Sequence, residues 1–414
     1  DSTAGSAWWY LNASVRMHSV SNVTVGRSDA RPGATIEAYD STNLGGNYKW
    51  VFAESGFNTN TWTGVTDSDW DKTNNWSRKR STIFTDAVVI PGGCPHDPLL
   101  DFDKRMLSLT ISNGASMGLN GFDLTVDEDT RVAGTLNAAG AETLTLGGDL
   151  DFSGGGGFSA ASTTVLLSGS NAQSAVSGGN AFYQLTISNS AGPVVFPDAV
   201  AATRILNLAT PVTFAGNVTV VSAFRTQGTN VVFGGALTVP AFYSENGALV
   251  FSGAVATVTF TNWAGSTTFH DDLSSQTFYG APGGMDLTFG AGSTYTMGEL
   301  ELYGRRGSPI RLRSSTEGSQ WYLEVTNWAK VRQVDVKDSN ASTGETVVPL
   351  ASENSGNNLN WEFGGPWRTW GGAVSSVFTN ENNWSPPGTP SLGVCLLIDG
   401  NYVTAPILSG VWTS

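Results

Sequence analysis

Three alternating aspartates are the candidate residues for binding a metal ion. Asp67, Asp69 and Asp71 form a D-x-D-x-D pattern, which is how an oxygen-ligand calcium loop begins. An EF-hand loop would continue with glycine at its sixth position and glutamate at its twelfth, where this chain has Lys72 and Arg78. Calcium at these aspartates is therefore the only cofactor we consider, and the alternative is a solvated acidic turn.

Paired carboxylates are the candidates for cleaving a polysaccharide. Asp271 and Asp272 are adjacent, and Glu299 and Glu301 alternate, so the two glutamates would share one face of a strand. Glycosidases use two carboxyl groups that flank the scissile bond. The same spacing also suits a solvated strand edge, so we assign no catalytic residue and predict that the chain is not an enzyme.

Nucleophilic and thiol chemistry find little support in the sequence. Residues Gly114 to Gly118 match G-x-S-x-G, but a nucleophile elbow needs a helix after the serine, and a strand-like run follows here. Cys94 and Cys395 are too few for a disulfide framework or a cysteine-based zinc site, and buried free thiols are the default expectation. The three histidines are scattered and stand in no motif.

Composition points to an exported protein. The chain has 414 residues, 50 of them glycine, only 14% charged residues and a net charge of −14. Nucleic-acid binding needs a basic surface, so we predict no nucleic-acid partner. No apolar run approaches the length of about 18 residues typical of a membrane helix, so we predict no membrane insertion. We expect a mature form or an excised piece, located outside the cell or at its surface.

A long internal repeat explains the distribution of the fourteen tryptophans, of which six lie in residues 1–76 and seven in residues 321–414. Residues 9–11, Trp-Tyr-Leu, recur at 321–323, and residues 74–77, Asn-Asn-Trp-Ser, recur at 382–385. The chain therefore contains one period of about 310 residues plus a second copy of its first hundred. We predict that six tryptophans form equivalent module joints: Trp50, Trp62, Trp76, Trp361, Trp370 and Trp384.

The repeat predicts five domains. Residues 1–52 and 321–363 are two copies of an end-of-module β segment, residues 53–100 and 364–414 are two copies of a Trp-rich joining module, and residues 101–320 lie between them. The chain is then either a window from a longer tandem-repeat protein or a protomer with related docking modules at its two ends.

A regular spacing of aromatic residues predicts the fold of the middle domain. Apolar residues alternate there in short runs, which is the strand signal. One phenylalanine series steps by 18 to 20 residues: Phe196, Phe214, Phe233, Phe251, Phe269 and Phe289. A second apolar series steps by 19 or 20: Val220, Val239, Val258, Phe278 and Met297. Stacked coils of about 19 residues suit an all-β, right-handed parallel β-helix, or β-solenoid. Asn-Gly pairs keep a string of antiparallel β-sandwiches as the alternative.

Several segments resemble the repeats of large secreted bacterial surface proteins. These are residues 62–77, residues 86–91, the pair of stretches 164–169 and 182–187, and residues 319–361. The resemblance implies an adhesin-like or filamentous protein similar in build to filamentous haemagglutinin. Its motifs specify architecture and imply no catalytic residue.

The sequence thus predicts a structural protein, the repeating unit of an extracellular filament, stalk or adhesin that assembles end to end. Its partners would be copies of itself or neighbouring modules. The alternative is a secreted β-helix that binds or cleaves carbohydrate, with surface glycans as partners and exposed tryptophans stacking on sugar rings.

Overall fold

The computed structural model describes residues 7–13, 18–33, 35–53, 58–208, 210–281, 284–363, 368–388, 396–398 and 400–407. Cys395 lies outside these residues. The chain forms two compact units, residues 1–225 and residues 226–414. The described residues contain β-strands and two short 3-10 helices, η1 (Thr73–Asn75) and η2 (Glu381–Asn383), and no α-helix.

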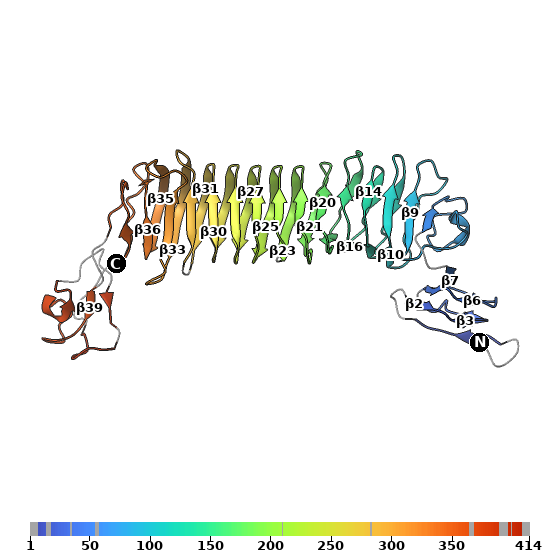
Figure 1. Cartoon of the computed structure of the whole chain (residues 1–414), viewed down its shortest axis with the longest axis horizontal. Helices are drawn as coiled ribbons and strands as arrows, with labels where there is room; N and C mark the ends of the chain where they lie inside the picture. Colours follow the sequence, from blue (N-terminus) through green and yellow to red (C-terminus); the bar gives the residue numbers. More distant parts are fainter. Residues whose placement is uncertain are drawn as a thin grey trace. The chain divides into compact units, whose positions relative to one another are not determined.

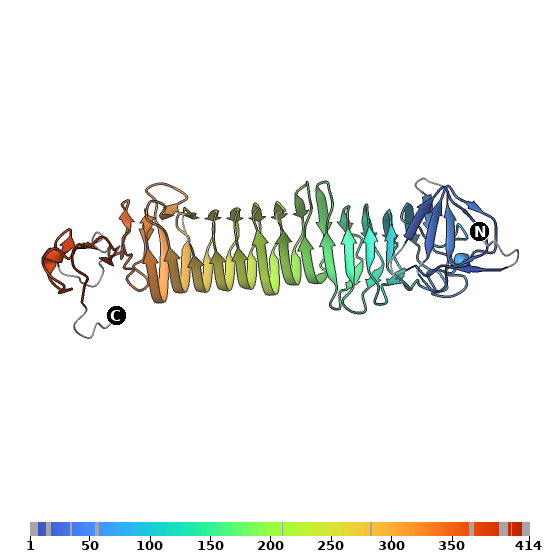
Figure 2. The ribbon, with the colours of Figure 1, turned by 90° about the horizontal axis from the view of Figure 1, so that it is seen from below.

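The first unit contains two long parallel sheets and a short third one, and each coil of the chain adds one strand to each long sheet (Figures 1 and 2). One long sheet holds, in order, β10 (Lys104–Met106), β13 (Leu124–Val126), β16 (Thr143–Leu146), β19 (Thr164–Leu167), β21 (Ala181–Ile187), β23 (Val200–Leu208) and β25 (Val218–Gln227). The other holds β8 (Asn58–Thr61), β9 (Asp86–Ile90), β11 (Ser108–Ile111), β14 (Thr130–Val132), β17 (Leu150–Asp151), β20 (Gln173–Val176), β22 (Val194–Phe196) and β24 (Val212–Phe214). The short sheet is β12 (Ser116–Gly118), β15 (Thr135–Asn137) and β18 (Gly157–Ser159).

Small parallel sheets precede these in the first unit. They pair β1 (Trp9–Tyr10) with β4 (Ser28–Asp29), β3 (Thr24–Val25) with β6 (Thr42–Asn43), and β2 (His18–Ser21) with β5 (Ile36–Tyr39) and then β7 (Trp50–Ala53). Each strand pairs with one about 18 residues further along, which is the stacking pattern of solenoid coils.

The second unit repeats the two-sheet arrangement. One sheet holds β27 (Leu237–Ser244), β29 (Val255–Asn262), β31 (Leu273–Gly280), β33 (Thr294–Tyr303), β35 (Trp321–Arg332) and β37 (Ser339–Asn340). The other holds β26 (Val231–Phe233), β28 (Ala248–Phe251), β30 (Ser266–Phe269), β32 (Asp286–Phe289), β34 (Ile310–Ser314), β36 (Val334–Val336) and β38 (Glu353–Asn354). A third sheet joins β40 (Trp384–Ser385), β39 (Arg368–Trp370) and β41 (Leu396–Leu397).

The chain is therefore an all-β protein built as a parallel β-solenoid, and the antiparallel β-sandwiches considered from the sequence are not its architecture. Alternation of buried and accessible residues follows from the strand period of two, as in β13 and β32. Parallel in-register pairing places equivalent side chains of successive coils one above another.

The first phenylalanine series lies in register inside the coils. In the second unit Phe233, Phe251, Phe269 and Phe289 pair in sequence along β26, β28, β30 and β32. Their rings stack at centroid distances of 4.9, 5.0 and 5.9 Å and are at most 2% exposed. In the first unit Phe196 stacks on Phe214 at 4.9 Å. These columns bury a continuous apolar core within each unit.

The second apolar series does not form a column, which corrects the expectation from spacing. Val239 pairs with Thr257, and Val258 is 51% exposed. The column at this place is Phe242, Phe260 and Phe278, whose rings stack at 4.8 and 4.9 Å. These coils are 18 residues long, and a slip of one residue moves a strand side chain to the opposite face of the sheet.

Replacing a member of the ring column should destabilise the solenoid. Phe233→Asp removes a fully buried ring and places a carboxylate in an apolar core, so we expect it to cost more than the roughly 3–5 kcal/mol of a Phe-to-Ala change. Thermal unfolding followed by circular dichroism measures this loss. Val258→Asp, at an exposed position of the same unit, is the matched control, and equal melting temperatures for the two variants would contradict the assignment.

Candidate functional site: the tryptophan-rich joints

Three indole rings form the centre of the first joining module. Trp62, Trp70 and Trp76 are fully buried, and the Trp76 ring meets the other two edge-on at centroid distances of 5.0 and 4.8 Å. The Trp62 indole N–H donates to the backbone carbonyl of His96 at 2.7 Å, and that of Trp70 donates to Thr82 Oγ1 at 2.9 Å. Because these rings are buried and hydrogen-bonded, they support the module and offer no face to a ligand.

A buried asparagine fixes the loop that carries the acidic turn. Asn75, at the end of η1, is fully buried. Its side-chain oxygen accepts the backbone N–H of Thr66 at 2.9 Å, and its amide donates to the carbonyls of Asp67 and Asp69, each at 3.0 Å. The loop backbone is thereby satisfied by one side chain, which explains why the Asn-Trp pair stands at this place.

The second joining module repeats this geometry with one substitution. Trp370 and Trp384 meet edge-on at 5.0 Å, and Phe378 takes the place of Trp70 against Trp384, also at 5.0 Å. Asn383 accepts the backbone N–H of Val374 at 2.8 Å and donates to the carbonyl of Val377 at 3.0 Å. The two modules therefore have the same internal structure, although they lie in different units.

The two end-of-module segments also share their local structure. The Trp50 indole donates to Ser28 Oγ at 2.9 Å and that of Trp361 to Ser339 Oγ at 3.0 Å. Four pairs of equivalent non-glycine residues have the same positive φ: Asn22 and Gln333, Arg27 and Asp338, Asp40 and Ala351, Lys49 and Asn360. Left-handed backbone at these matched points shows that the coil corners recur, while the five domain boundaries stay a prediction.

A buried lysine holds two aspartates at the first joint. Lys104 is 5% exposed, and its ammonium lies 2.7 Å from Asp71 and 3.1 Å from Asp101. Asp71 also accepts hydrogen bonds from Thr35 at 2.9 Å and Ser81 at 2.6 Å. Burial disfavours the charged form of Asp71, but the Lys104 ammonium and these hydrogen bonds outweigh it and lower the pKa to about 2. Burial dominates at Asp101 and raises its pKa to about 6. The cluster joins the N-terminal coils, the module and the first strand that follows it.

A buried glutamate lies in the same joint without full compensation. Glu37 is 2% exposed, accepts a hydrogen bond from the Tyr39 hydroxyl, and lies 3.4 Å from the backbone nitrogen of Phe84. Its Oε1 has no hydrogen-bond partner. Burial raises the pKa of Glu37 to about 7. Nearby Asp86, which is fully buried, is instead paired in two contacts with Arg80.

The three aspartates of the predicted calcium loop point to different partners. Asp67 pairs with Lys72 at 2.9 Å, Asp69 accepts the backbone N–H of Asp71 at 3.0 Å, and Asp71 belongs to the Lys104 cluster. Within the described residues no group of three or more His, Cys, Asp or Glu side chains is arranged to hold a metal ion. Calcium at this loop stays a prediction, now with the carboxylates already engaged by the protein.

The carboxylates considered for polysaccharide cleavage lie apart in two places. Asp272 accepts the backbone N–H of Thr294, at the start of β33, whereas Glu299 lies five residues further along that strand and accepts from Thr277. Five strand residues span about 17 Å, beyond the roughly 5–9.5 Å that separates glycosidase carboxyl groups. Glu301, on the same face as Glu299, accepts from the Tyr303 hydroxyl.

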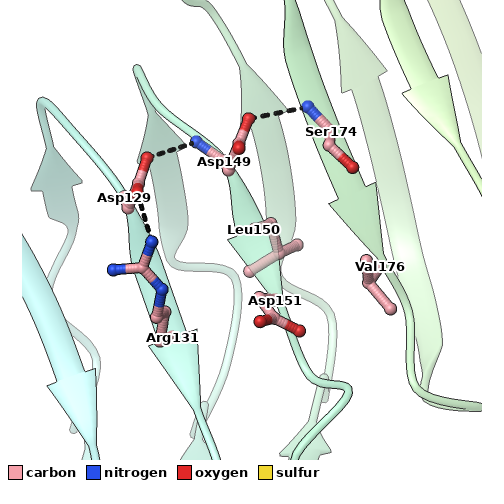
Figure 3. Close-up of a pocket in the computed structure, with 7 residues that line it drawn as sticks. All are labelled: Asp129, Arg131, Asp149, Leu150, Asp151, Ser174 and Val176. Atoms are coloured by element: carbon pink, nitrogen blue, oxygen red, sulfur yellow. Dashed lines mark hydrogen bonds and ion pairs between the residues drawn. The ribbon is translucent and has the colours of Figure 1, made fainter.

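Other aspartates of the first unit bind successive coils together (Figure 3). Asp129 accepts the backbone N–H of Asp149 at 3.2 Å, and Asp149 accepts that of Ser174 at 2.7 Å. The hollow they line, with Arg131 and Asp151, has a volume of about 110 Å³. These carboxylates satisfy backbone donors between coils, a role that sequence patterns did not reveal because each partner lies 20 or more residues away.

The candidate nucleophiles are likewise structural. Ser116 of the G-x-S-x-G match lies in strand β12 and accepts a hydrogen bond from Asn137 at 2.9 Å. Cys94 is a free thiol whose pKa is raised by burial, and its Sγ lies 3.5 Å from the backbone oxygens of Trp62 and Pro91.

The fold and its repeated joints define the chain as a parallel β-solenoid with two copies of one Trp-rich module. No known protein family, curated protein or solved structure matches it. Among the described residues no helix has the length and apolar character that a membrane crossing requires.

Removing the cation of the joint should be costly. Lys104→Met leaves Asp71 and Asp101 without their counter-charge in a largely buried place, which we expect to cost about 3–5 kcal/mol. Urea unfolding measures the loss. The triple variant with Asp71→Asn and Asp101→Asn should recover most of it. Lys79→Met, at an exposed position, is the control, and an equal effect of the two lysine changes would refute the role of Lys104.

Stability should fall as the pH rises through neutrality. The pKa of Glu37 is raised from 4.5 to about 7 in the folded chain, so folding takes up a proton between these values and the gain is lost above them. Asp101, with a pKa of about 6, acts in the same direction. We expect the free energy of unfolding to drop by up to about 3 kcal/mol from pH 5 to pH 8 because of Glu37.

Urea titrations of the native chain and of Glu37→Gln at pH 5, 6, 7 and 8 test this expectation. The variant should lose less stability across the range. Glu128→Gln, at an exposed site, should follow the native chain. Parallel curves for the native chain and Glu37→Gln would show that Glu37 does not titrate in this way.

Proposed function

We propose that the chain is a structural protein, the repeating unit of an extracellular filament, stalk or adhesin that assembles end to end. The observation that supports this proposal is the recurrence of one joint before and after the solenoid, with the same indole geometry and the same coil corners. A protein that needs one joint for folding has no evident use for a second, whereas a repeating assembly uses the same joint at every period.

The chemistry of the side chains is consistent with a mechanical role. Buried rings form columns, aspartates close the backbone between coils, and buried charges tie the joint to its neighbours. Each of these groups stabilises stacking, and none of them is arranged around a substrate. The low content of charged residues and the resemblance to bacterial surface repeats support an extracellular place for the assembly.

A second candidate, carbohydrate binding, is favoured by one surface feature of the second unit. Tyr243, Trp263, Tyr279 and Tyr303 form a chain of ring contacts with centroid distances of 6.5, 5.6 and 5.9 Å. Trp263 is 38% exposed, and the Arg332 guanidinium lies 5.0 Å from the Tyr303 ring centre. Accessible aromatic faces beside a polar group suit the apolar face of a sugar.

Electron microscopy of the purified chain separates the two candidates. The structural role predicts linear assemblies whose length grows with protein concentration. Monomers at every concentration that bind a panel of surface polysaccharides would contradict it and support the second candidate. In that case Trp263→Ala should abolish binding, and Trp328→Ala, at another partly exposed tryptophan of the same unit, should leave it intact.

A further inference from the structure

The first three strands of the chain form an open solenoid end. Within the described part of the first unit, β1, β2 and β3 each have a paired strand on one side only. Such edges carry a row of unpaired backbone N–H and C=O groups that can template another strand. An open edge of this kind needs a partner that presents a parallel strand.

The second copy of the same segment shows what fits this edge. Its equivalent strands, β35 and β36, pair in parallel with β33 and β34, over nine residue pairs in the first case and three in the second. The Trp321 ring, equivalent to Trp9, lies on Phe289 at a centroid distance of 4.1 Å. The coil formed by β32, β33 and β34 is therefore a template for the occupant of the open edge.

Exposure differs between the two copies as expected for an uncovered face. Tyr10 is 71% exposed, and its equivalent Tyr322 is 38% exposed. Trp321 and Leu323 are buried at 0% and 1%, whereas Trp9 and Leu11 are partly exposed. The apolar side chains that the second copy covers with β33 are thus left accessible in the first.

We propose that this open edge binds the β33–β34 edge of a second copy of the chain, by exchange with that copy's own residues 321–363. The proposal rests on the proposed function and specifies its interface. Incoming and outgoing segments have the same coil corners and the same strand pairings, so each pairing broken on exchange is replaced by an equivalent one. Exchange of matching elements is a low-cost route to association, and a head-to-tail contact of this type propagates into an open filament.

The register of the second copy predicts the register of the exchanged pair. Tyr322 lies beside Thr294, so Tyr10 of one chain should lie beside Thr294 of the next. Neighbouring strands are about 4.8 Å apart, which lies within the Cα range that a disulfide can bridge. Thr296, two residues further along β33 on the same face, would lie about 8 Å from Tyr10, beyond that range.

Disulfide trapping in the full chain tests the proposal, in a Cys94→Ser, Cys395→Ser background. Chains with Tyr10→Cys and differently tagged chains with Thr294→Cys are mixed, warmed to permit exchange, and oxidised. We expect a covalent dimer of the two tagged chains, and at least tenfold less of it when Thr296→Cys replaces Thr294→Cys. Failure to trap a dimer, or equal trapping at the two positions, would overturn the proposal.

A charge at the edge provides the second arm. Leu11→Asp, added to the Tyr10→Cys chain, should abolish trapping because the equivalent Leu323 is buried against the coil. Val65→Asp, at a position 60% exposed in the joining module, should not. The register comparison uses chains with Leu11 intact, so it decides the matter even where Leu11→Asp fails to fold. Fibres without the register-specific link would overturn the exchange alone, and the link without fibres would overturn the filament alone.

Discussion

Parallel pairing of each coil with the next is the interaction on which the rest of this structure depends. Every coil leaves backbone donors and acceptors on the side that faces its neighbour, and these groups are satisfied only when the neighbour lies in register. The stacked rings of Phe233 and Phe251, 4.9 Å apart, are a consequence of that register and not an independent device. The stability of any one coil is therefore shared with the coils beside it.

Charged groups serve the same requirement where the backbone turns away from the ladder. Asp129 and Asp149 each accept the backbone N–H of a later coil, and Lys104 joins Asp71 to Asp101 where the N-terminal coils meet the module. Ionised groups in such places lose hydration and are tolerated because several partners share the charge. Glu37, with one oxygen left without a partner, shows the cost when the compensation is incomplete.

Regular features of the sequence revealed the fold, and irregular ones did not. The spacing from Phe233 to Phe289 indicated stacked coils because each coil contributes one buried ring to the same column. The series through Val258 was wrong because coils of 18 residues were counted as 19, and that single residue reverses the face. The handedness of the coils stays a prediction. The Lys104 cluster could not be predicted, because the ammonium and Asp71 lie 33 residues apart and belong to no motif.

The repeat carries information that neither composition nor motifs provide. Position for position, the second joint keeps Trp62, Trp76 and Asn75 as Trp370, Trp384 and Asn383, and replaces Asp71 by Thr379. What both copies keep is the packing and backbone geometry of the module, while the buried charges are particular to the first. The shared part is thus sufficient to build the joint. The Lys104 cluster adds attachment between the N-terminal coils and the module, and this attachment fixes how the open edge of β1 to β3 is presented.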